Sequence, residues 1–186
     1  MSRADRERWD ERYQTEKWDT QHEPFPVLVK YADRRTGGLA LDLACGLGHN
    51  AVWLARHGYC VLGVDISRVA LEKGLAAARR QGVADSILFV EADLEHFRAP
   101  PERFDLIGVI RFLNRDMFPN IQAALKPGGQ LIYATLNWRW LISHPDTERR
   151  YLLEPGELLH AFSELDVIVY SEEGDISYLV ARKPAL

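Results

Sequence analysis

Short apolar runs alternate with helix-like patterns along most of the chain. The runs have the length of β-strands, and they fall at 39–44, 60–65, 87–90, 104–110 and 130–135. The fourth run is apolar almost throughout, which is typical of a strand that is covered on both faces. Alternating strand and helix patterns predict βαβ units around a parallel sheet, and we expect five βα units.

The segments between the runs carry helix signals. Apolar spacing predicts helices over 49–58 and 67–82, with Ser67 as the N-cap of the second. Another helix is expected after Asp116, which would cap it, with Pro119 in the first turn, where proline is tolerated.

The last part of the chain predicts a hairpin. Lys126-Pro-Gly-Gly129 forces a break before the fifth strand, and a short helix is expected over 157–162. Two strand patterns follow, 165–170 and 175–181, with a short glycine-containing turn between them. The sheet therefore has a terminal antiparallel hairpin beside its five parallel strands.

Two segments fall outside this scheme. Residues 1–36 are expected to form two helices that cap the sheet. Residues 136–153 form a link rich in Trp, Arg and Pro, and long loops in compact domains are often functional. The link leaves the fifth strand at the carboxyl edge, where α/β sheets bind ligands. We expect one domain over 1–186, with its core over 39–135 and the last helix and hairpin over 155–182.

Composition and charge exclude some classes of function but do not identify one. The 186 residues fit one domain, and 47% hydrophobic with 27% charged residues indicate a soluble globular protein. The net charge of −4 gives no electrostatic attraction to nucleic acid or to an anionic membrane. Neither a membrane span of roughly 18 apolar residues nor a signal-peptide pattern is seen. We expect a cytoplasmic monomer or homodimer with no nucleic-acid or membrane partner.

A glycine-rich turn after the first strand is the strongest candidate site. It runs Asp42-Leu-Ala-Cys-Gly46-Leu-Gly48. Without side chains at Gly46 and Gly48 the backbone can approach a ligand closely, and the following helix N-terminus favours a negative group. With Ala51 the spacing fits the dinucleotide pattern G-x-G-x-x-G/A, which is weak by itself. The alternative is a tight turn without a ligand.

Acids at two later strand ends extend this site. Asp65 ends the second run, 65 − 46 = 19 positions after Gly46, where an acid binds ribose hydroxyls in such folds. Its alternative role is to cap the next helix, although Ser67 already supplies a cap. Asp93 follows the third run and could accept a hydrogen bond from an adenine amino group, or serve only as a turn cap.

In combination these motifs make the chain resemble the class I S-adenosylmethionine-dependent methyltransferases, and within them the small tellurite-resistance and thiopurine-type enzymes. The matching stretches are 41–48, 61–67, 91–94, 103–107 and 124–129. The resemblance implies S-adenosylmethionine as the cofactor. It also implies an α/β fold with a Rossmann-like, seven-stranded, mostly parallel sheet, an antiparallel C-terminal hairpin and helices on both faces.

The resemblance implies roles for individual residues. The turn surrounds the methionine part of the cofactor, Asp65 binds ribose, Ile66 packs on adenine, and the residues after the fourth strand line the methyl-transfer cavity. The cofactor-binding set is Asp42, Cys45, Gly46, Gly48, Asp65, Ile66, Asp93, Leu94 and Arg111, and the cavity candidates are Arg111 and Phe112. The chain departs from the family at Ala44 and Asn50, where many members have glycine, so its turn is less permissive.

The N-terminal segment resembles one that folds over the cofactor in those enzymes. Trp9, Arg12 and Tyr13 fall at i, i+3 and i+4, on one helix face, and Trp18 follows. In this interpretation Arg12 reaches the cofactor carboxylate, and the aromatic side chains help to exclude water. The alternative is that this face simply packs on the domain.

The leading hypothesis is an enzyme that moves the sulfonium methyl group to a small acceptor. Such a reaction needs in-line positioning and exclusion of water rather than acid–base groups. Trp138, Trp140 and Phe112 could wall an apolar cavity, with Arg111 or Arg139 orienting an anionic acceptor. The absence of an obvious base favours a soft nucleophile, such as a thiol or a reduced chalcogen species.

Other functions share parts of this pattern. A nicotinamide-dependent oxidoreductase would use Gly46, Gly48 and Asp65, but Asp42, the later glycine-rich break and the hairpin speak against it. A non-catalytic, cofactor-binding regulatory module would differ only in lacking turnover. The histidines show no paired spacing, so no metal is expected. Cys45 lies near a helix N-terminus, yet we interpret it as a small buried turn residue rather than a nucleophile.

Overall fold

One mixed sheet organises the chain. The computed structural model describes residues 3–15, 23–33 and 37–185. Its strands pair in the order β3-β2-β1-β4-β5-β7-β6, with β7 antiparallel to both neighbours and the other pairs parallel. The bounds are β1 Leu39–Leu43, β2 Cys60–Asp65, β3 Ile87–Glu91, β4 Phe104–Ile110, β5 Leu125–Leu136, β6 Asp166–Ser171 and β7 Ile176–Arg182. The predicted sheet and its antiparallel C-terminal hairpin are confirmed.

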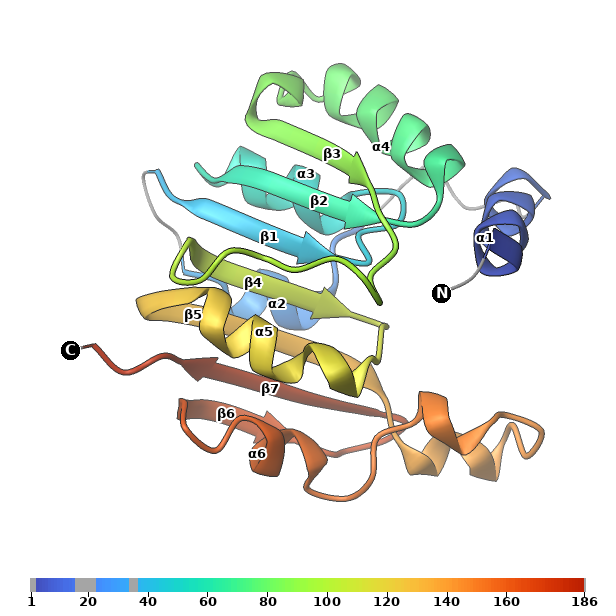
Figure 1. Cartoon of the computed structure of the whole chain (residues 1–186), viewed down its shortest axis with the longest axis vertical. Helices are drawn as coiled ribbons and strands as arrows, with labels where there is room; N and C mark the ends of the chain where they lie inside the picture. The colour runs from blue at the N-terminus through green and yellow to red at the C-terminus, as the bar shows by residue number, and fades with distance from the viewer. Residues whose placement is uncertain (1–2, 16–22, 34–36, 186) are drawn as a thin grey trace.

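Helices cover both faces of the sheet (Figure 1). α2, α3 and α4 pack on one face, whereas α5 and α6 pack on the other. Their bounds are α2 Pro26–Tyr31, α3 His49–Arg56, α4 Arg68–Arg80, α5 Phe118–Ala124 and α6 Glu157–Ala161. α1, Arg3–Thr15, stands beside α4 at the carboxyl edge of the strands. None of the described helices is long and apolar enough to cross a membrane.

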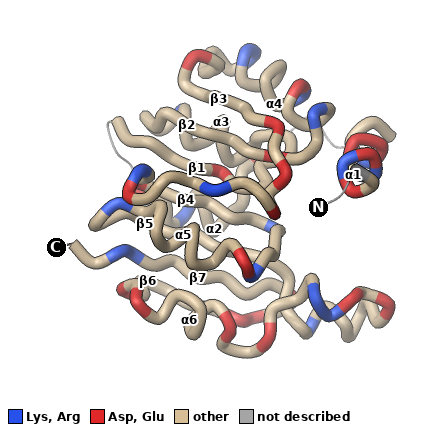
Figure 2. The backbone as a smooth tube through the Cα atoms, in the orientation of Figure 1, with Lys and Arg blue, Asp and Glu red and all other residues tan. Residues whose placement is uncertain are grey.

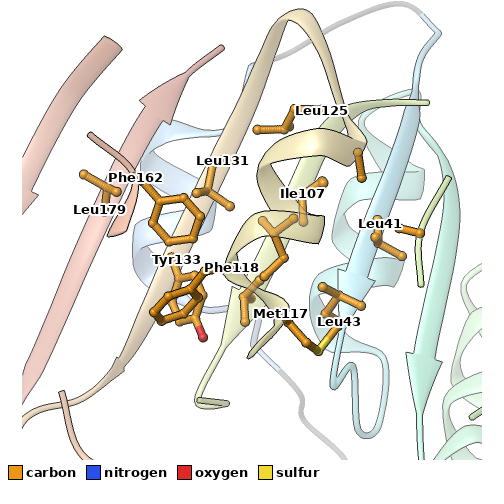
Figure 3. Packing of buried hydrophobic residues seen from close by; sticks show 14 of the residues in the cluster. Leu41, Leu43, Ile107, Met117, Phe118, Leu125, Leu131, Tyr133, Phe162 and Leu179 are labelled. Carbon is orange, nitrogen blue, oxygen red and sulfur yellow. The ribbon is translucent and has the colours of Figure 1, made fainter. Parts of the chain in front are cut away.

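Neighbouring positions along the central strands point to opposite faces, and both are buried. Leu106 and Ile107 of β4 are each 0% exposed, yet they belong to different core clusters. Figure 3 shows the cluster of Ile107, in which Tyr133 packs against Phe118 and Phe162. Burial on both faces explains why the central strands are continuous apolar runs in the sequence.

Predictions for the segments before β4 and before α5 were wrong. Between β3 and β4 the described chain forms turns in place of a helix, so the third of the five predicted βα units is incomplete, and Leu94 and Ala99 fill the core there. The residue that caps the turn before α5 is Asn114 rather than Asp116. The Asn114 side chain accepts the Asp116 N–H at 3.1 Å, because an asparagine oxygen can replace a backbone acceptor at a turn.

The glycine-rich segment 126–129 is a bulge within β5, not a break before it. Phe104 pairs with Leu125, and the pairing resumes between Leu106 and Gln130 after a shift in register. The extra residues of a bulge are left out of the ladder, so the strand continues on either side of them.

The link after β5 is anchored on the C-terminal hairpin. It contains two short 3-10 segments, Trp138–Ile142 and Arg149–Tyr151. The Asn137 side chain donates to the Gly174 carbonyl at 3.1 Å and to Ser177 Oγ at 3.2 Å. These contacts fix the start of the link at the carboxyl edge of the sheet.

Candidate functional site

The glycine-rich turn joins β1 to α3 at the carboxyl edge of the sheet (Figure 1). Gly48 has a φ of 73°, and its N–H donates to the Cys45 carbonyl at 2.9 Å. A Cβ at Gly48 would lie 2.6 Å from Cζ of Phe89 in β3. This glycine is therefore required by backbone conformation and packing, whether or not a ligand approaches the turn.

Asp65 connects the end of β2 to this turn. Its Oδ2 accepts the Gly46 N–H at 2.8 Å, and its Oδ1 accepts the Ser67 N–H at 2.9 Å. Burial raises the pKa of Asp65, while the Ser67 and Gly46 amides oppose that rise. A carboxylate offers about four acceptor positions, so the backbone amides do not use all of them. Ser67 itself caps α4, because its Oγ accepts the Ala70 N–H at 3.1 Å.

Asp42 brings a second buried acid to the turn. It is 1% exposed, and its Oδ2 has no hydrogen-bond partner in the part of the chain that the structure describes. Burial first, and the charge of Asp65 second, raise the pKa of Asp42 to about 7. A buried carboxyl group without a partner favours a donor or a cation beside it. Asp42 is therefore suited to a positively charged ligand group.

The other turn residues show how the departures from glycine are accommodated. Ala44 has a φ of 55°, a left-handed conformation that costs alanine energy and glycine almost none. Asn50 has gained a contact, since its Oδ1 accepts the Phe25 N–H at 2.8 Å and ties the start of α2 to α3. Burial raises the pKa of the Cys45 thiol, which keeps it protonated and unlike a nucleophile.

The residues predicted around adenine lie together beside the ends of β2 and β3. The Ala92 N–H donates to the Asp65 carbonyl at 2.9 Å and so joins the two strand ends. Ile66 and Leu94 are 4% and 1% exposed. Asp93 accepts a backbone N–H two residues further on at 2.9 Å, so it does cap a turn, in agreement with the alternative interpretation. A second role in binding adenine is compatible with that bond.

Arg111 and Phe112 follow β4 at the same edge. Arg111 has a φ of 56°, and its N–H donates to the Ala134 carbonyl at 2.7 Å, so its backbone is fixed to β5. Its exposed side chain makes no ion pair or hydrogen bond with any described residue. Phe112 is half-buried against the core, and its carbonyl accepts the Tyr133 hydroxyl at 3.0 Å. Two left-handed non-glycine residues, Ala44 and Arg111, thus follow adjacent strands.

The aromatic face of α1 reaches the glycine turn. The Tyr13 hydroxyl lies 2.7 Å from the position that a Gly46 Cβ would occupy. The Trp9 and Tyr13 rings stack with centroids 5.8 Å apart, and the exposed Arg12 guanidinium lies 5.1 Å from the Trp9 ring centroid. The predicted face therefore exists, and Tyr13 brings it to the turn. Trp18 lies outside the described residues.

Sequence reasoning missed two polar contacts of α1. Arg6 pairs with Glu91 of β3 at 3.2 Å, and Asp10 accepts the Ser67 hydroxyl at 2.6 Å. With Tyr13 they fall at i, i+4 and i+7 and share one helix face. A search for apolar spacing does not register such a face, although a search for any i, i+4, i+7 set would.

The link brings tryptophans to the carboxyl edge of the sheet, whereas the guanidinium of Arg139 is bound elsewhere. Trp138 Nε1 is buried without a hydrogen-bond partner among the described residues. Arg139 lies 4.6 Å from the Trp138 ring centroid and donates to the Glu172 carbonyl at 2.7 Å. Its guanidinium therefore holds the link on the hairpin, and Arg111 is the better candidate for an anionic acceptor. Trp140 stacks on a histidine of the link at 3.6 Å.

Comparison with known proteins matches the core of the chain to methyltransferases. Residues 40–129 match the family model of a methyltransferase domain. A ubiquinone biosynthesis O-methyltransferase of Coxiella burnetii is 32% identical over 120 residues, 60% of this chain and 50% of that protein. The methyltransferase GfsG of Streptomyces halstedii is 35% identical over 115 residues, 59% of this chain and 41% of that protein. The chain spans about half the length of the curated relatives it matches.

The fold is shared with a solved methyltransferase structure. The S-adenosylmethionine-dependent methyltransferase from Mesorhizobium loti superposes with a TM-score of 0.70 at 19% identity, over 85% of this chain and 96% of that one. The narrower likeness to the tellurite-resistance and thiopurine-type enzymes stays a prediction. The matched core, together with the glycine turn and its buried acids, supports a class I S-adenosylmethionine-dependent methyltransferase with S-adenosylmethionine as its cofactor.

Proposed function

We propose that this chain transfers the methyl group of S-adenosylmethionine to a small-molecule acceptor. The observation that carries the proposal is the pair of buried acids, Asp42 and Asp65, at the glycine turn. Asp65 keeps acceptor positions for ribose hydroxyls, and the unpartnered oxygen of Asp42 suits the ammonium of the methionine part. Ile66, Asp93 and Leu94 form the adenine side of the proposed site.

Methyl transfer from S-adenosylmethionine requires little acid–base catalysis by the protein. A lone pair of the acceptor attacks the methyl carbon, the carbon–sulfur bond breaks, and its electrons stay on the sulfur of S-adenosylhomocysteine. An acceptor that carries a proton releases it to solvent. The chain holds the two reactants in line and excludes water. In this proposal α1 and the link (136–153) close the site.

Arg111 and Phe112 face the acceptor in this proposal. The Arg111 guanidinium is exposed and can bind an anionic acceptor through paired N–H donors. The buried Trp138 indole N–H is a donor for a polar group of the acceptor. Thiols and reduced chalcogen species are our first acceptor class, and the named O-methyltransferase relative supports hydroxyl compounds beside them. The enzyme acts as a cytoplasmic monomer or homodimer without a nucleic-acid partner.

Two measurements test this function. Titration calorimetry should show binding of S-adenosylmethionine and S-adenosylhomocysteine and far weaker binding of NAD, and the opposite ranking would falsify the proposal. A methyl-transfer screen should then find turnover on small thiols, chalcogen species or hydroxyl compounds. Methylation of RNA, DNA or protein alone would contradict the acceptor class. Cofactor binding with no turnover on any acceptor would support the regulatory module instead.

A further inference from the structure

α1 docks beside the cofactor site through a polar face. Arg6, Asp10 and Tyr13 share that face of the helix. Between residues 4 and 15 no side chain of α1 is buried. The helix is therefore held by polar contacts and partial cover rather than by insertion into the core.

The contacts of this face span the cofactor site from one side to the other. Glu91, the partner of Arg6, lies opposite Asp65 in the pairing of β2 with β3. The Tyr13 hydroxyl, about two turns further along α1 than Arg6, lies over Gly46. Figure 2 shows acidic positions gathered at the carboxyl ends of β2 and β3, on the side that α1 faces. α1 thus lies over the glycine turn and beside the end of β3, next to the positions at which the ribose and the methionine part of the cofactor are proposed to lie.

Ser67 bridges α1 to the cofactor acid. Its N–H donates to Asp65 Oδ1 at 2.9 Å, and its hydroxyl donates to Asp10 Oδ1 at 2.6 Å. The same Asp10 oxygen accepts the Val69 N–H at 3.2 Å. The Asp10 carboxylate therefore sits at the N-terminus of α4, where the helix dipole favours a negative charge. Asp10, Ser67 and Asp65 form a continuous hydrogen-bonded chain between the two segments.

We propose that Asp10 is a positioning residue that latches α1 over the bound cofactor, so that docking of α1 and binding of cofactor are coupled. The inference rests on the proposed function. A helix of 13 residues is marginally stable alone, and α1 buries no side chain between residues 4 and 15, so docked and undocked α1 are close in free energy. Contact between docked α1 and the bound cofactor shifts this equilibrium toward the docked state. By thermodynamic linkage, the Asp10 contacts that favour docking also raise the affinity for the cofactor.

Asp10→Ala tests the latch, with Glu11→Ala as the matched control. Glu11 is an exposed acid of the same helix. Apart from the backbone bonds of the helix, its only described hydrogen bond is the one that its carbonyl accepts from the Thr15 hydroxyl. In Asp10→Ala we expect the affinity for S-adenosylhomocysteine to fall about five- to ten-fold, through faster dissociation. Asp10→Asn keeps the accepting oxygen and should recover most of the affinity, and Glu11→Ala should match the wild type.

Hydrogen exchange gives a readout that a merely structural role would not move. S-adenosylhomocysteine should slow exchange of the α1 amides in the wild type and in Glu11→Ala, but not in Asp10→Ala. Wild-type affinity in Asp10→Ala, or α1 exchange that ignores the ligand in the wild type, overturns the latch. A wild-type protein that binds no S-adenosylhomocysteine overturns both the latch and the proposed function, and the calorimetry of the unmodified chain shows which case applies.

Discussion

The Gly46 N–H donates to Asp65 Oδ2 over 2.8 Å, across 19 positions of the chain. One carboxylate therefore fixes the turn between β1 and α3 and also lies at the proposed ribose site. Removal of this carboxylate changes both the turn and the site, so its variants must separate stability from binding.

Asp65→Ala is expected to weaken cofactor binding by about 1–3 kcal/mol, because it removes charge-assisted hydrogen bonds to ribose. The free energy of unfolding should fall by about 1–2 kcal/mol as well, since two backbone amides lose their acceptor. Asp65→Asn keeps one acceptor oxygen and separates charge from shape. Calorimetry well below each Tm measures the binding, and normal affinity in Asp65→Ala would place ribose elsewhere.

Asp42 predicts a pH-dependent stability. Its pKa rises from 3.8 in the unfolded chain to about 7 in the folded protein, so between these values the folded state binds the proton more tightly. The contribution of Asp42 to the free energy of unfolding therefore falls as pH rises through this window and is constant above it. Asp42→Asn removes the titration, and relative to wild type it should gain about 1–4 kcal/mol between pH 4 and pH 8.

Urea unfolding of wild type and Asp42→Asn across this pH range gives the comparison, because titration of the other groups largely cancels between the two proteins. Parallel stability curves for the two proteins would show that the Asp42 carboxyl group titrates near its ordinary pKa. Cofactor added at pH 6 should release protons, since a cation beside Asp42 favours the ionised form. Calorimetry in buffers of different ionisation enthalpy measures that release.

Ala44→Gly is expected to stabilise the protein by about 0.5–1 kcal/mol, because glycine adopts a positive φ without the strain that alanine bears. The φ of 55° at Ala44 is the basis of this prediction. Ala51→Gly, inside α3, is the matched control and should destabilise, since glycine is unfavourable within a helix. Chemical denaturation compares the two, and a loss of stability in Ala44→Gly would mean that the turn holds alanine without strain.

The sequence predicted those parts of the fold that follow from a local pattern of apolar residues. β2 and β4 have the bounds of their apolar runs, because residues that point to either face are buried. The turns between β3 and β4 could not be foreseen in this way. Leu94 and Ala99 fill the core from irregular backbone, and apolar spacing alone does not distinguish that from a helix.

The residues of the site also fall into those that a local pattern predicted and those that it did not. Gly46 and Asp65 followed from strand ends and spacing, since adjacent parallel strands bring their carboxyl ends together. Asp10 lies 57 positions from Ser67, and nothing near it in a strongly charged helix marks that partner. Arg139 was predicted, as the alternative to Arg111, to orient the acceptor, yet it contacts the hairpin, which only the folded chain brings beside it.

Arg111 offers the sharpest test of how the acceptor is held. Its backbone is fixed by the 2.7 Å hydrogen bond to Ala134, while its side chain is exposed, so substitution should change the site without disturbing the sheet. Arg111→Ala keeps a Cβ and hence the left-handed strain, so stability should stay close to wild type. For an anionic acceptor we expect kcat/KM to fall about ten- to a hundred-fold, mostly through KM.

Arg111→Lys should be intermediate, because it keeps the charge but not the paired donors of guanidinium. Arg150→Ala, which removes an exposed link arginine that pairs with Glu148 at 2.9 Å, is the matched control and should leave the kinetics unchanged. The affinity for S-adenosylmethionine separates the two roles considered for Arg111. If Arg111→Ala weakens the cofactor and slows charged and neutral acceptors alike, the guanidinium binds the cofactor carboxylate. If only anionic acceptors suffer and cofactor affinity is kept, the guanidinium binds the acceptor.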